Sequence, residues 1–376
     1  MNIAIIGCGF VADYYVRTLE NHPSLNIMGV MDRNPDRAKQ FSDYYSLPKY
    51  DTLDAVLRDD RVQLVVNLTN PRNHYEVSKA ALEAGKHVYS EKPLATDYAE
   101  AKELVELAES KGLHISSAPC SLLGETAQTI WKALREKAIG HPYLVYAEMD
   151  DGLVHKMMYQ SWKSESGTPW PYKDEFEVGC TLEHAGYYLT WFPAFFGPAV
   201  NVSAFADCLV KEKVNDVELD PPNTPDFSVA CIKFASGVVA RLTCSIVAAH
   251  DHELKIFGET GILSTEDCWY YRSPVHIKRR FNIRRKTIVS PIPETYPLVS
   301  NLTKKQKYRG AQQMDFARGI AEMAEAIQQG HAPYLSARYS LHVNEMVLAI
   351  HNALDTGTSY RMETTFEPLE PLSWAR

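Results

Sequence analysis

The sequence predicts an α/β protein with an N-terminal Rossmann dinucleotide-binding domain and a C-terminal α/β domain built on an open, mainly antiparallel sheet. Over the first ~118 residues, short apolar segments alternate with amphipathic helical segments, as a parallel sheet with crossover helices requires. A Gly-x-Gly-x-x-Ala motif follows the first apolar segment. Beyond residue 140 the strands alternate apolar and polar residues, which is typical of an antiparallel sheet with one free face.

The elements of the parallel sheet follow from this alternation. We expect strands at 2–6, 26–31, 62–68, 86–90 and 114–117, and helices at 10–21, 34–45, 52–58, 74–84 and 97–111. Asn34 is the expected N-cap of the second helix, with Pro35 at its first position. Gly85 and Gly112 are expected to end helices.

The remaining two thirds of the chain are expected to form the second domain. We expect a helix at 125–137, strands at 143–149, 199–209, 226–235, 238–248, 252–258 and 261–265, and late helices at 314–329 and 340–355. The region 266–312 is rich in Arg, Lys and Pro, and we interpret it as a loop insertion. The predicted domains are 1–120 and 121–376, with a late helix packing back on the first domain.

Composition excludes several functions. A net charge of -8 argues against a nucleic-acid partner, because binding phosphates needs a basic surface. The seven cysteines have no CxxC or metal-ligand spacing, so we expect buried, reduced thiols and no metal site. No apolar run approaches the ~18 residues of a membrane span, and no secretory leader precedes the first strand. We therefore expect a cytoplasmic protein without a membrane partner.

The glycine-rich motif predicts where a dinucleotide binds. It consists of Gly7, Gly9, Phe10, Val11 and Ala12, between the first strand and the first helix. The first glycine permits a tight turn, the second allows backbone to approach a pyrophosphate, and the alanine permits close packing of helix on strand. The helix N-terminus supplies amide donors and a positive dipole end to the phosphates.

Two residues at the end of the second strand bear on the choice of cofactor. Asp32 lies 23 residues beyond Gly9, where a carboxylate can accept hydrogen bonds from the adenosine ribose. A carboxylate repels a 2′-phosphate, so the sequence favours NAD. Arg33 beside it could stack on adenine or meet that phosphate, which leaves NADP as the alternative.

The segment 83–95 contains Glu91-Lys92-Pro93 at the end of the fourth strand. Together with the opening motif, it resembles the glucose-fructose oxidoreductase / inositol dehydrogenase / rhizopine-catabolism (Gfo/Idh/MocA) oxidoreductase family. The segments 70–74 and 336–338 fit the same family, and the resemblance covers most of the chain.

The resemblance implies a pocket between the two domains, where nicotinamide meets a sugar, cyclitol or nucleotide-sugar. Lys92 would lie near the nicotinamide and the reacting hydroxyl, where its ammonium stabilises a developing alkoxide. Further implied cofactor contacts are Thr69, Asn70, His74 and Glu91. A cis peptide before Pro93 and a homodimer or homotetramer formed through the open sheet are also implied.

The family's Asp-x-Gly-x-His motif has a divergent counterpart at 179–188. Alignment on Gly179 places Glu183 at the Asp position and Tyr187 at the His position; spaced i, i+4, they would share a helix face. Tyr187 is then the expected acid/base, and its usual pKa near ~10 suits protonation of an alkoxide. With a shifted helix register, His184 becomes the titrating group.

Two segments offer further contacts. Trp162-Lys163 and the stretch 170–176 combine aromatic and charged residues suited to sugar recognition, and Lys163 and Lys173 are the expected substrate contacts. A basic segment comprises Lys278, Arg279, Arg280, Arg284, Arg285, Lys286, Lys304, Lys305, Lys307 and Arg309. It reads as a solvated loop or subunit contact, or else as a phosphate site.

Three functions compete at this point. The first is an NAD(P)-dependent dehydrogenase or reductase acting on a sugar, cyclitol or nucleotide-sugar. The second keeps NAD bound and runs a redox-neutral elimination, epimerisation or glycosidic cleavage. The third is a non-catalytic sensor of NAD and a ligand, which the retained Lys92 and Tyr187 argue against.

Overall fold

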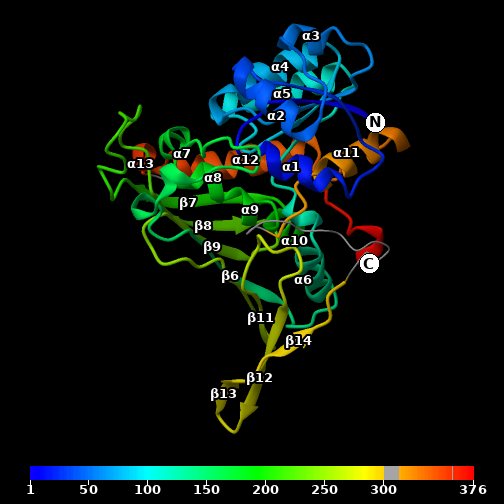
Figure 1. The fold of residues 1–376 in the computed structure, drawn as a ribbon. Helices are drawn as coiled ribbons and strands as arrows, with labels where there is room; N and C mark the ends of the chain where they lie inside the picture. The colour runs from blue at the N-terminus through cyan, green and yellow to red at the C-terminus, as the bar shows by residue number, and fades with distance from the viewer. Residues whose placement is uncertain (300–312, 358) are drawn as a thin grey trace.

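The computed structural model describes residues 1–299, 313–357 and 359–376. The N-terminal domain contains a five-stranded parallel sheet in the order β2-β1-β3-β4-β5 (Figure 1). Its strands are β1 (Asn2–Ile6), β2 (Asn26–Met31), β3 (Leu64–Asn67), β4 (His87–Ser90) and β5 (Ile115–Ser117). The Rossmann prediction is confirmed, because every strand lies within the range expected from the alternation of apolar and helical segments.

Helices cover both faces of this sheet, which explains why its strands are apolar throughout. The helices are α1 (Ala12–Leu19), α2 (Pro35–Tyr45), α3 (Leu53–Leu57), α4 (His74–Glu83) and α5 (Tyr98–Ser110). One buried cluster joins Ile3 and Ile5 of β1 to Tyr15 of α1, and a second joins Ala4 of β1 to Leu104 of α5.

Helix starts are fixed by the side chains that the sequence suggested. Asn34 Oδ1 accepts hydrogen bonds from Asp36 N and Arg37 N, and Pro35 occupies the first turn. Asp97 caps α5 in the same way. Thr52 caps α3 through a bond from Ala55 N to its hydroxyl.

The second domain is built on a ten-stranded sheet, ordered β13-β12-β11-β10-β6-β9-β8-β7-β15, with β14 paired to β12. Its central strands are β6 (Pro142–Asp150), β7 (Ala199–Asp207), β8 (Phe227–Phe234), β9 (Val239–Ser245), β10 (Leu254–Gly258) and β11 (Gly261–Thr265). All pairings are antiparallel except β6 with β9. The prediction of a mainly antiparallel sheet is therefore confirmed.

Burial alternates along these strands, so one face of the sheet packs on helices and the other is open. The covering helices are α6 (Glu125–Arg135), α7 (Tyr172–Val178), α8 (Cys180–His184), α9 (Gly186–Leu189) and α10 (Phe192–Phe196). Short 3-10 turns occupy Pro71–Asn73, Ser121–Leu123, Val154–Lys156, Tyr159–Ser161 and Ser373–Ala375.

The interpretation of 266–312 as a loop insertion is wrong for its described part. Residues Val275–Ile283 form β12, Lys286–Val289 form β13 and Glu294–Tyr296 form β14. Only Val275 and Ile277 of β12 are buried, because the rest of the β12–β13 hairpin projects away from the body of the chain (Figure 1). With no core to face beyond residue 279, the strand lacks the apolar alternation that would have revealed it.

The late helices bring the two domains together. They are α11 (Arg318–Gln329), α12 (Ala337–His351) and α13 (Ala353–Thr356), followed by β15 (Tyr360–Arg361). In Figure 1, α12 lies between the N-terminal domain and the second sheet. Ser340 Oγ accepts a hydrogen bond from Ser117 N (3.1 Å), and Asn344 Nδ2 donates to Ala95 O (3.1 Å). These bonds fasten α12 to the N-terminal domain as well as to the sheet.

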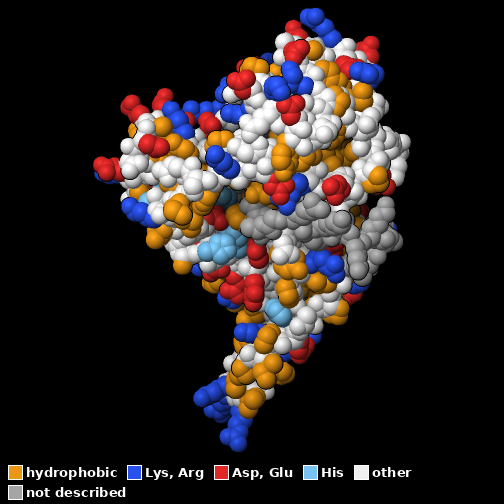
Figure 2. All heavy atoms as spheres, in the orientation of Figure 1, with side chains coloured by type: hydrophobic (Ala, Val, Ile, Leu, Met, Phe, Trp, Pro, Cys, Tyr) orange, Lys and Arg blue, Asp and Glu red, His pale blue; other side chains and the backbone are white. Residues whose placement is uncertain are grey.

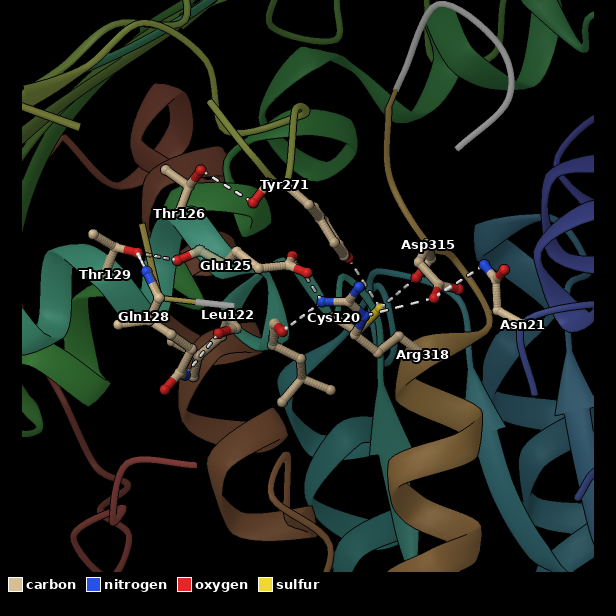
Figure 3. A network of polar contacts seen from close by, with 12 residues as sticks. Asn21, Cys120, Leu122, Glu125, Thr126, Gln128, Thr129, Tyr271, Asp315 and Arg318 are labelled. Carbon is tan, nitrogen blue, oxygen red and sulfur yellow. Dashed lines mark hydrogen bonds and ion pairs between the residues drawn. The ribbon is translucent and has the colours of Figure 1, made fainter. Parts of the chain in front are cut away.

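A polar network closes the other side of the junction (Figure 3). Arg318 of α11 donates to Leu123 O (2.9 Å) and pairs with Glu125 (3.1 Å). Cys120 Sγ lies 3.2 Å from the Tyr271 hydroxyl. The start of α6, the start of α11 and the segment before β12 are therefore held together beneath the parallel sheet.

The seven cysteines are free, but they are not all buried, since Cys208 is partly accessible and Cys231 is exposed. None of the helices that the structure describes is long and apolar enough to cross a membrane.

Candidate active site

A cavity of about 870 Å³ lies between the two domains and is lined by residues of both. Most of the predicted site residues line it: Gly9, Phe10, Val11, Arg33, Thr69, Asn70, His74, Glu91, Lys92, Glu183, His184 and Tyr187. Gly7, Ala12 and Asp32 lie behind its wall, and Lys163 and Lys173 lie outside it. Its volume is within the range of cofactor and substrate sites.

The glycine loop has the geometry that a dinucleotide site needs. Gly7 has φ +98°, and a Cβ there would lie 2.5 Å from Leu68 O, so only glycine fits. A Cβ at Gly9 would meet no heavy atom within 4 Å, because this face opens on the cavity. Ala12 is fully buried beneath the loop. The loop therefore fits a pyrophosphate at the N-terminus of α1.

The adenosine end of the site carries both signs of charge. Asp32 is only 7% exposed, and it accepts hydrogen bonds from Cys8 N (2.9 Å) and Asn34 N (2.8 Å). Arg37 Nη1 lies 3.6 Å from its Oδ2, and both Arg33 and Arg37 line the cavity. The preference for NAD over NADP, which rests on Asp32, stays a prediction, since Arg37 pairs with this carboxylate and Arg33 also lines the cavity.

The ends of β3 and β4 place the next group of predicted residues. His74 is buried, and its Nδ1 lies 2.6 Å from Pro93 O and its Nε2 2.9 Å from Thr69 O. Burial lowers the pKa of this imidazole. Glu91 accepts a hydrogen bond from the Tyr15 hydroxyl (2.6 Å). The side chains beneath the cavity are thus held by contacts within the N-terminal domain.

Lys92 reaches across the junction and donates to Glu183 Oε2. The Lys92–Pro93 peptide is cis. Burial works against the charge of Lys92, but Glu183 and Tyr187 more than offset it and raise its pKa above the usual range. Before a cofactor binds, Lys92 is a cation, suited to donating a hydrogen bond to an oxygen that gains negative charge.

The helix expected to carry Glu183 and Tyr187 is in fact two short helices, α8 and α9, which meet at Ala185. Glu183 and Tyr187 both line the cavity, but His184 between them lines it as well. The cavity therefore contains both candidates for the acid/base, Tyr187 and His184. Burial raises the pKa of the Tyr187 phenol, although Lys92 opposes this effect, so the hydroxyl keeps its proton at neutral pH.

Glu175 of α7 is a cavity residue that the sequence interpretation did not single out. Burial and the neighbouring Glu183 raise the pKa of its carboxyl well above the usual range, while Lys92 opposes the shift. Glu175 therefore lies close to both Glu183 and Lys92, and its surroundings favour the protonated form of its carboxyl. Glu175 lies in the stretch 170–176 that the sequence marked for sugar recognition, but its proximity to Glu183 and Lys92 depends on the approach of α7 to α8 and has no local signal.

A loop of the second domain covers the cavity and is anchored on the first. Ser166 N donates to Asp13 Oδ1 (2.8 Å), and Ser166 Oγ donates to Asp13 Oδ2 (2.9 Å). Trp162 and Trp170 of this loop lie at the wall of the cavity, and their role in sugar recognition stays a prediction. Lys163, by contrast, is exposed.

The remaining charged candidates do not reach the cavity. Lys173 is exposed and pairs with Glu177 (3.6 Å). The six basic residues between 278 and 286 lie on the β12–β13 hairpin, whose tip carries Lys and Arg side chains (Figure 2). Lys304, Lys305, Lys307 and Arg309 lie outside the described residues. A phosphate site within the cavity therefore gains no support from the described part of this segment.

A second polar group on the cavity wall was not expected from the sequence. Asp151 follows β6, and its Oδ2 lies 2.8 Å from His184 Nδ1 while its Oδ1 lies 3.0 Å from His252 Nε2. Despite its burial, these imidazoles hold the pKa of Asp151 below its usual range. The Trp269 ring packs against Tyr187 (5.5 Å between centroids) and His252 (4.3 Å). The His-x-His spacing at 250–252 was the available signal.

This arrangement of a Rossmann domain, a cleft and a lysine at the end of β4 defines an NAD-binding oxidoreductase. Residues 1–118 match the model of an oxidoreductase family with an NAD-binding Rossmann fold, and residues 127–264 match the GFO/IDH/MocA C-terminal domain. The chain belongs to the GFO/IDH/MocA oxidoreductase family, as the Glu91-Lys92-Pro93 segment suggested.

Known relatives span most of the chain. The trans-1,2-dihydrobenzene-1,2-diol dehydrogenase of Mus musculus is 23% identical over 70% of this chain and 74% of its own length. UDP-N-acetylglucosamine 3-dehydrogenase GnnA from Acidithiobacillus ferrooxidans superposes with a TM-score of 0.70 at 19% identity, over 95% of this chain and 98% of that one. KijD10, a 3-ketoreductase from Actinomadura kijaniata solved with NADP, gives 0.69 at 23% identity, over 95% and 97%. At these identities the structures support the fold alone.

Proposed function

We propose that the chain transfers hydride between NAD(P) and a hydroxyl or keto carbon of a sugar, cyclitol or nucleotide-sugar. The observation that carries this proposal is the contact between Lys92 and Glu183. It joins the end of β4 in one domain to α8 in the other, inside the cavity that also contains Tyr187. GnnA is named for the nucleotide-sugar UDP-N-acetylglucosamine, and an aldose-aldose oxidoreductase from Caulobacter crescentus has the same fold, which supports the substrate class.

NAD(P), when bound, supplies the hydride acceptor or donor. Lys92 donates a hydrogen bond to the oxygen on the reacting carbon and stabilises its negative charge. Tyr187 holds the proton that this oxygen exchanges. Glu183 orients Lys92 and accepts hydrogen bonds from neighbouring hydroxyls, while Trp162 and Trp170 offer faces on which a sugar ring can stack.

The test is a substrate screen followed by one substitution. Sugars, cyclitols, nucleotide-sugars and a trans-dihydrodiol are each incubated with NAD or NADP, and NAD(P)H absorbance is recorded. On the best substrate, Lys92→Met is expected to lower kcat by about 10²–10³-fold, because it removes a donor aimed at the developing oxyanion. Cofactor affinity is expected to stay unchanged.

The control is Lys102→Met, on an exposed position of α5 outside the cavity, which should retain wild-type turnover. Equal turnover by Lys92→Met and the wild type would contradict the catalytic assignment. Cofactor binding without turnover of any compound would favour the sensor hypothesis.

A redox-neutral reaction remains a second candidate, favoured by the raised pKa of Glu175. A carboxyl group with a raised pKa is better suited to protonate a leaving group, as an elimination or glycosidic cleavage requires. The two proposals differ in product, because stoichiometric accumulation of NADH during turnover is expected for a dehydrogenase and not for a redox-neutral enzyme.

We further infer that the chain forms a homodimer or homotetramer through the open face of the second sheet. Phe205 of β7, which is 56% exposed, supports this inference, because a large apolar side chain on a free sheet face favours association. A cytoplasmic location stays a prediction from composition.

A further inference from the structure

A cluster of potential metal ligands lies at the edge of the second sheet. A carboxylate oxygen of Asp151 and ring nitrogens of His250 and His252 all lie within 4.8 Å of one another. Asp151 directly follows β6, and the two histidines precede β10. Backbone hydrogen bonds between Asp150 and Asp251, of 2.9 Å and 3.0 Å, hold the two segments together. Strand pairing therefore holds Asp151 close to His250 and His252.

The ligands differ in how firmly they are held. The His252 side chain is fully buried, with Nε2 3.0 Å from Asp151 Oδ1 and Nδ1 3.5 Å from Asp267 Oδ1. His250 is exposed to the cavity, packs on the His252 ring (4.3 Å between centroids), and makes no hydrogen bond within the described part of the chain. One imidazole is thus positioned in advance, and the other is free to turn toward an ion.

Several buried polar atoms around the cluster lack a satisfactory partner. Asp151 Oδ2, His184 Nδ1 and His252 Nδ1 form no hydrogen bond of good geometry within the described residues. Asp151 Oδ2 and His184 Nδ1 form an ion pair at 2.8 Å, and His252 Nδ1 faces Asp267 Oδ1 at 3.5 Å. Buried atoms of this kind are unusual in a folded protein, and a bound ion or water is one cause of them.

The charge around the cluster also favours a cation. Besides Asp151 itself, the carboxylates of Asp150, Asp251 and Asp267 lie around the cluster. Neither a lysine nor an arginine among the described residues forms an ion pair with any of these four aspartates, and the ion-pair partners of Asp151 and Asp267 are histidines.

We propose that Asp151, His250 and His252 bind one divalent transition-metal ion of the zinc type on the wall of the cavity. Two imidazoles and one carboxylate form a ligand set that such ions favour, and it leaves at least one coordination position open. Asp267 supports the site as an outer carboxylate, because it faces the ring nitrogen of His252 that would not bind the ion.

The open position would face the substrate region. Asp151 and His250 line the cavity, and Trp269 links the cluster to Tyr187 through ring contacts on both sides. A water molecule or a substrate oxygen, such as a carboxylate or a pair of hydroxyls, would complete the coordination. The proposal goes beyond the proposed function and does not depend on it, since the ion would bind the free chain.

The test measures metal content directly. The full-length chain is stripped with a chelator, dialysed against buffer containing Zn²⁺ and excess Mg²⁺, and analysed for bound zinc. One zinc per chain is expected, because magnesium prefers oxygen ligands and would not compete. His250→Ala should weaken zinc binding by more than 100-fold, which is beyond the ~10–100-fold expected for loss of the outer carboxylate in Asp267→Asn.

His141→Ala is the matched control, since His141 is exposed directly before β6 and its ring contacts only Tyr143 among the described rings. It should bind zinc like the wild type. Thermal unfolding confirms that each variant folds, and Asp151→Asn replaces His250→Ala if the latter does not. Less than half an equivalent of zinc in the wild type would overturn the proposal, as would equal affinity in His250→Ala and His141→Ala.

Discussion

The two walls of the cavity are organised differently. The wall from the N-terminal domain consists of backbone turns and strand ends, with Gly7 under Leu68 and His74 between two carbonyl oxygens. The wall from the second domain consists of ionisable side chains on short helices and a loop, with Glu175 and Glu183 around Lys92. The first wall suits a ligand shared by a family, and the second suits a substrate particular to this chain.

The largest expected effect falls on the second wall. Tyr187→Phe should lower kcat by about 10²–10⁴-fold with cofactor affinity unchanged, because it removes the proton that the reacting oxygen exchanges. His184→Asn should lower kcat less than about tenfold, since the role of its imidazole would be to position Asp151. Initial rates on the substrate found by the screen measure both. A larger loss in the His184 variant would transfer the acid/base role to that residue.

On the first wall, substitutions of Gly7 and Gly9 are expected to have different effects. Gly7→Ala places a Cβ against Leu68 O at a positive φ and should destabilise the fold by about 1–3 kcal/mol. Gly9→Ala meets open space, so its stability should stay within about 0.5 kcal/mol of wild type. Its affinity for NAD should fall at least tenfold, or about 1.4 kcal/mol, because the methyl group would occupy pyrophosphate space.

Denaturant unfolding without cofactor and fluorescence titration with NADH separate these two effects. An equal loss of stability in both variants would show that Gly9 is a structural residue, like Gly7.

The smallest expected effect is a pH trend on the second wall. The pKa of Glu175 is raised in the folded chain, so the stability that this carboxyl contributes is complete below its unfolded pKa of ~4.3 and is lost as pH rises through the folded value. Glu175→Gln cannot ionise. Its Tm relative to wild type should therefore increase from pH 5 to pH 8, by about 2–4 °C for each kcal/mol.

Glu212→Gln is the control for this trend, since Glu212 is exposed and forms no ion pair within the described residues. It should follow the wild type at every pH. A Tm difference for Glu175→Gln that does not change with pH would show that the carboxyl is ionised in the folded chain.

The two walls of the cavity differ in how much of each could be predicted from the sequence, and the reason is physical. Gly7, Gly9 and the cap residue Asn34 act within one turn of chain, so the sequence contains their whole signal. Glu175 gains its role only from the approach of Glu183 and Lys92, which are 8 and 83 residues away along the chain. The structure gives no support to the substrate roles predicted for Lys163 and Lys173. The composition of a loop shows that it is polar, but it does not show which of its side chains point into the cavity.

The β12–β13 hairpin shows that the prediction of secondary structure also depends on contacts that are not local in the sequence. Its first residues, Val275 and Ile277, alternate with polar ones and are buried, while Phe281 and Ile283 further along are more than half exposed. A strand that does not face a core needs no alternation of apolar and polar residues. Its arginines and lysines were therefore interpreted as part of a loop.

The same hairpin has a practical consequence for measuring how many copies of the chain associate. It extends well beyond the body of the protein (Figure 2), so the chain experiences more drag than a sphere of equal mass. On a size-exclusion column calibrated with compact standards, even a single copy therefore elutes earlier than a compact protein of the same mass. Its apparent mass is then larger than its true mass. Light scattering or sedimentation equilibrium, which report mass independently of shape, is the measurement to use.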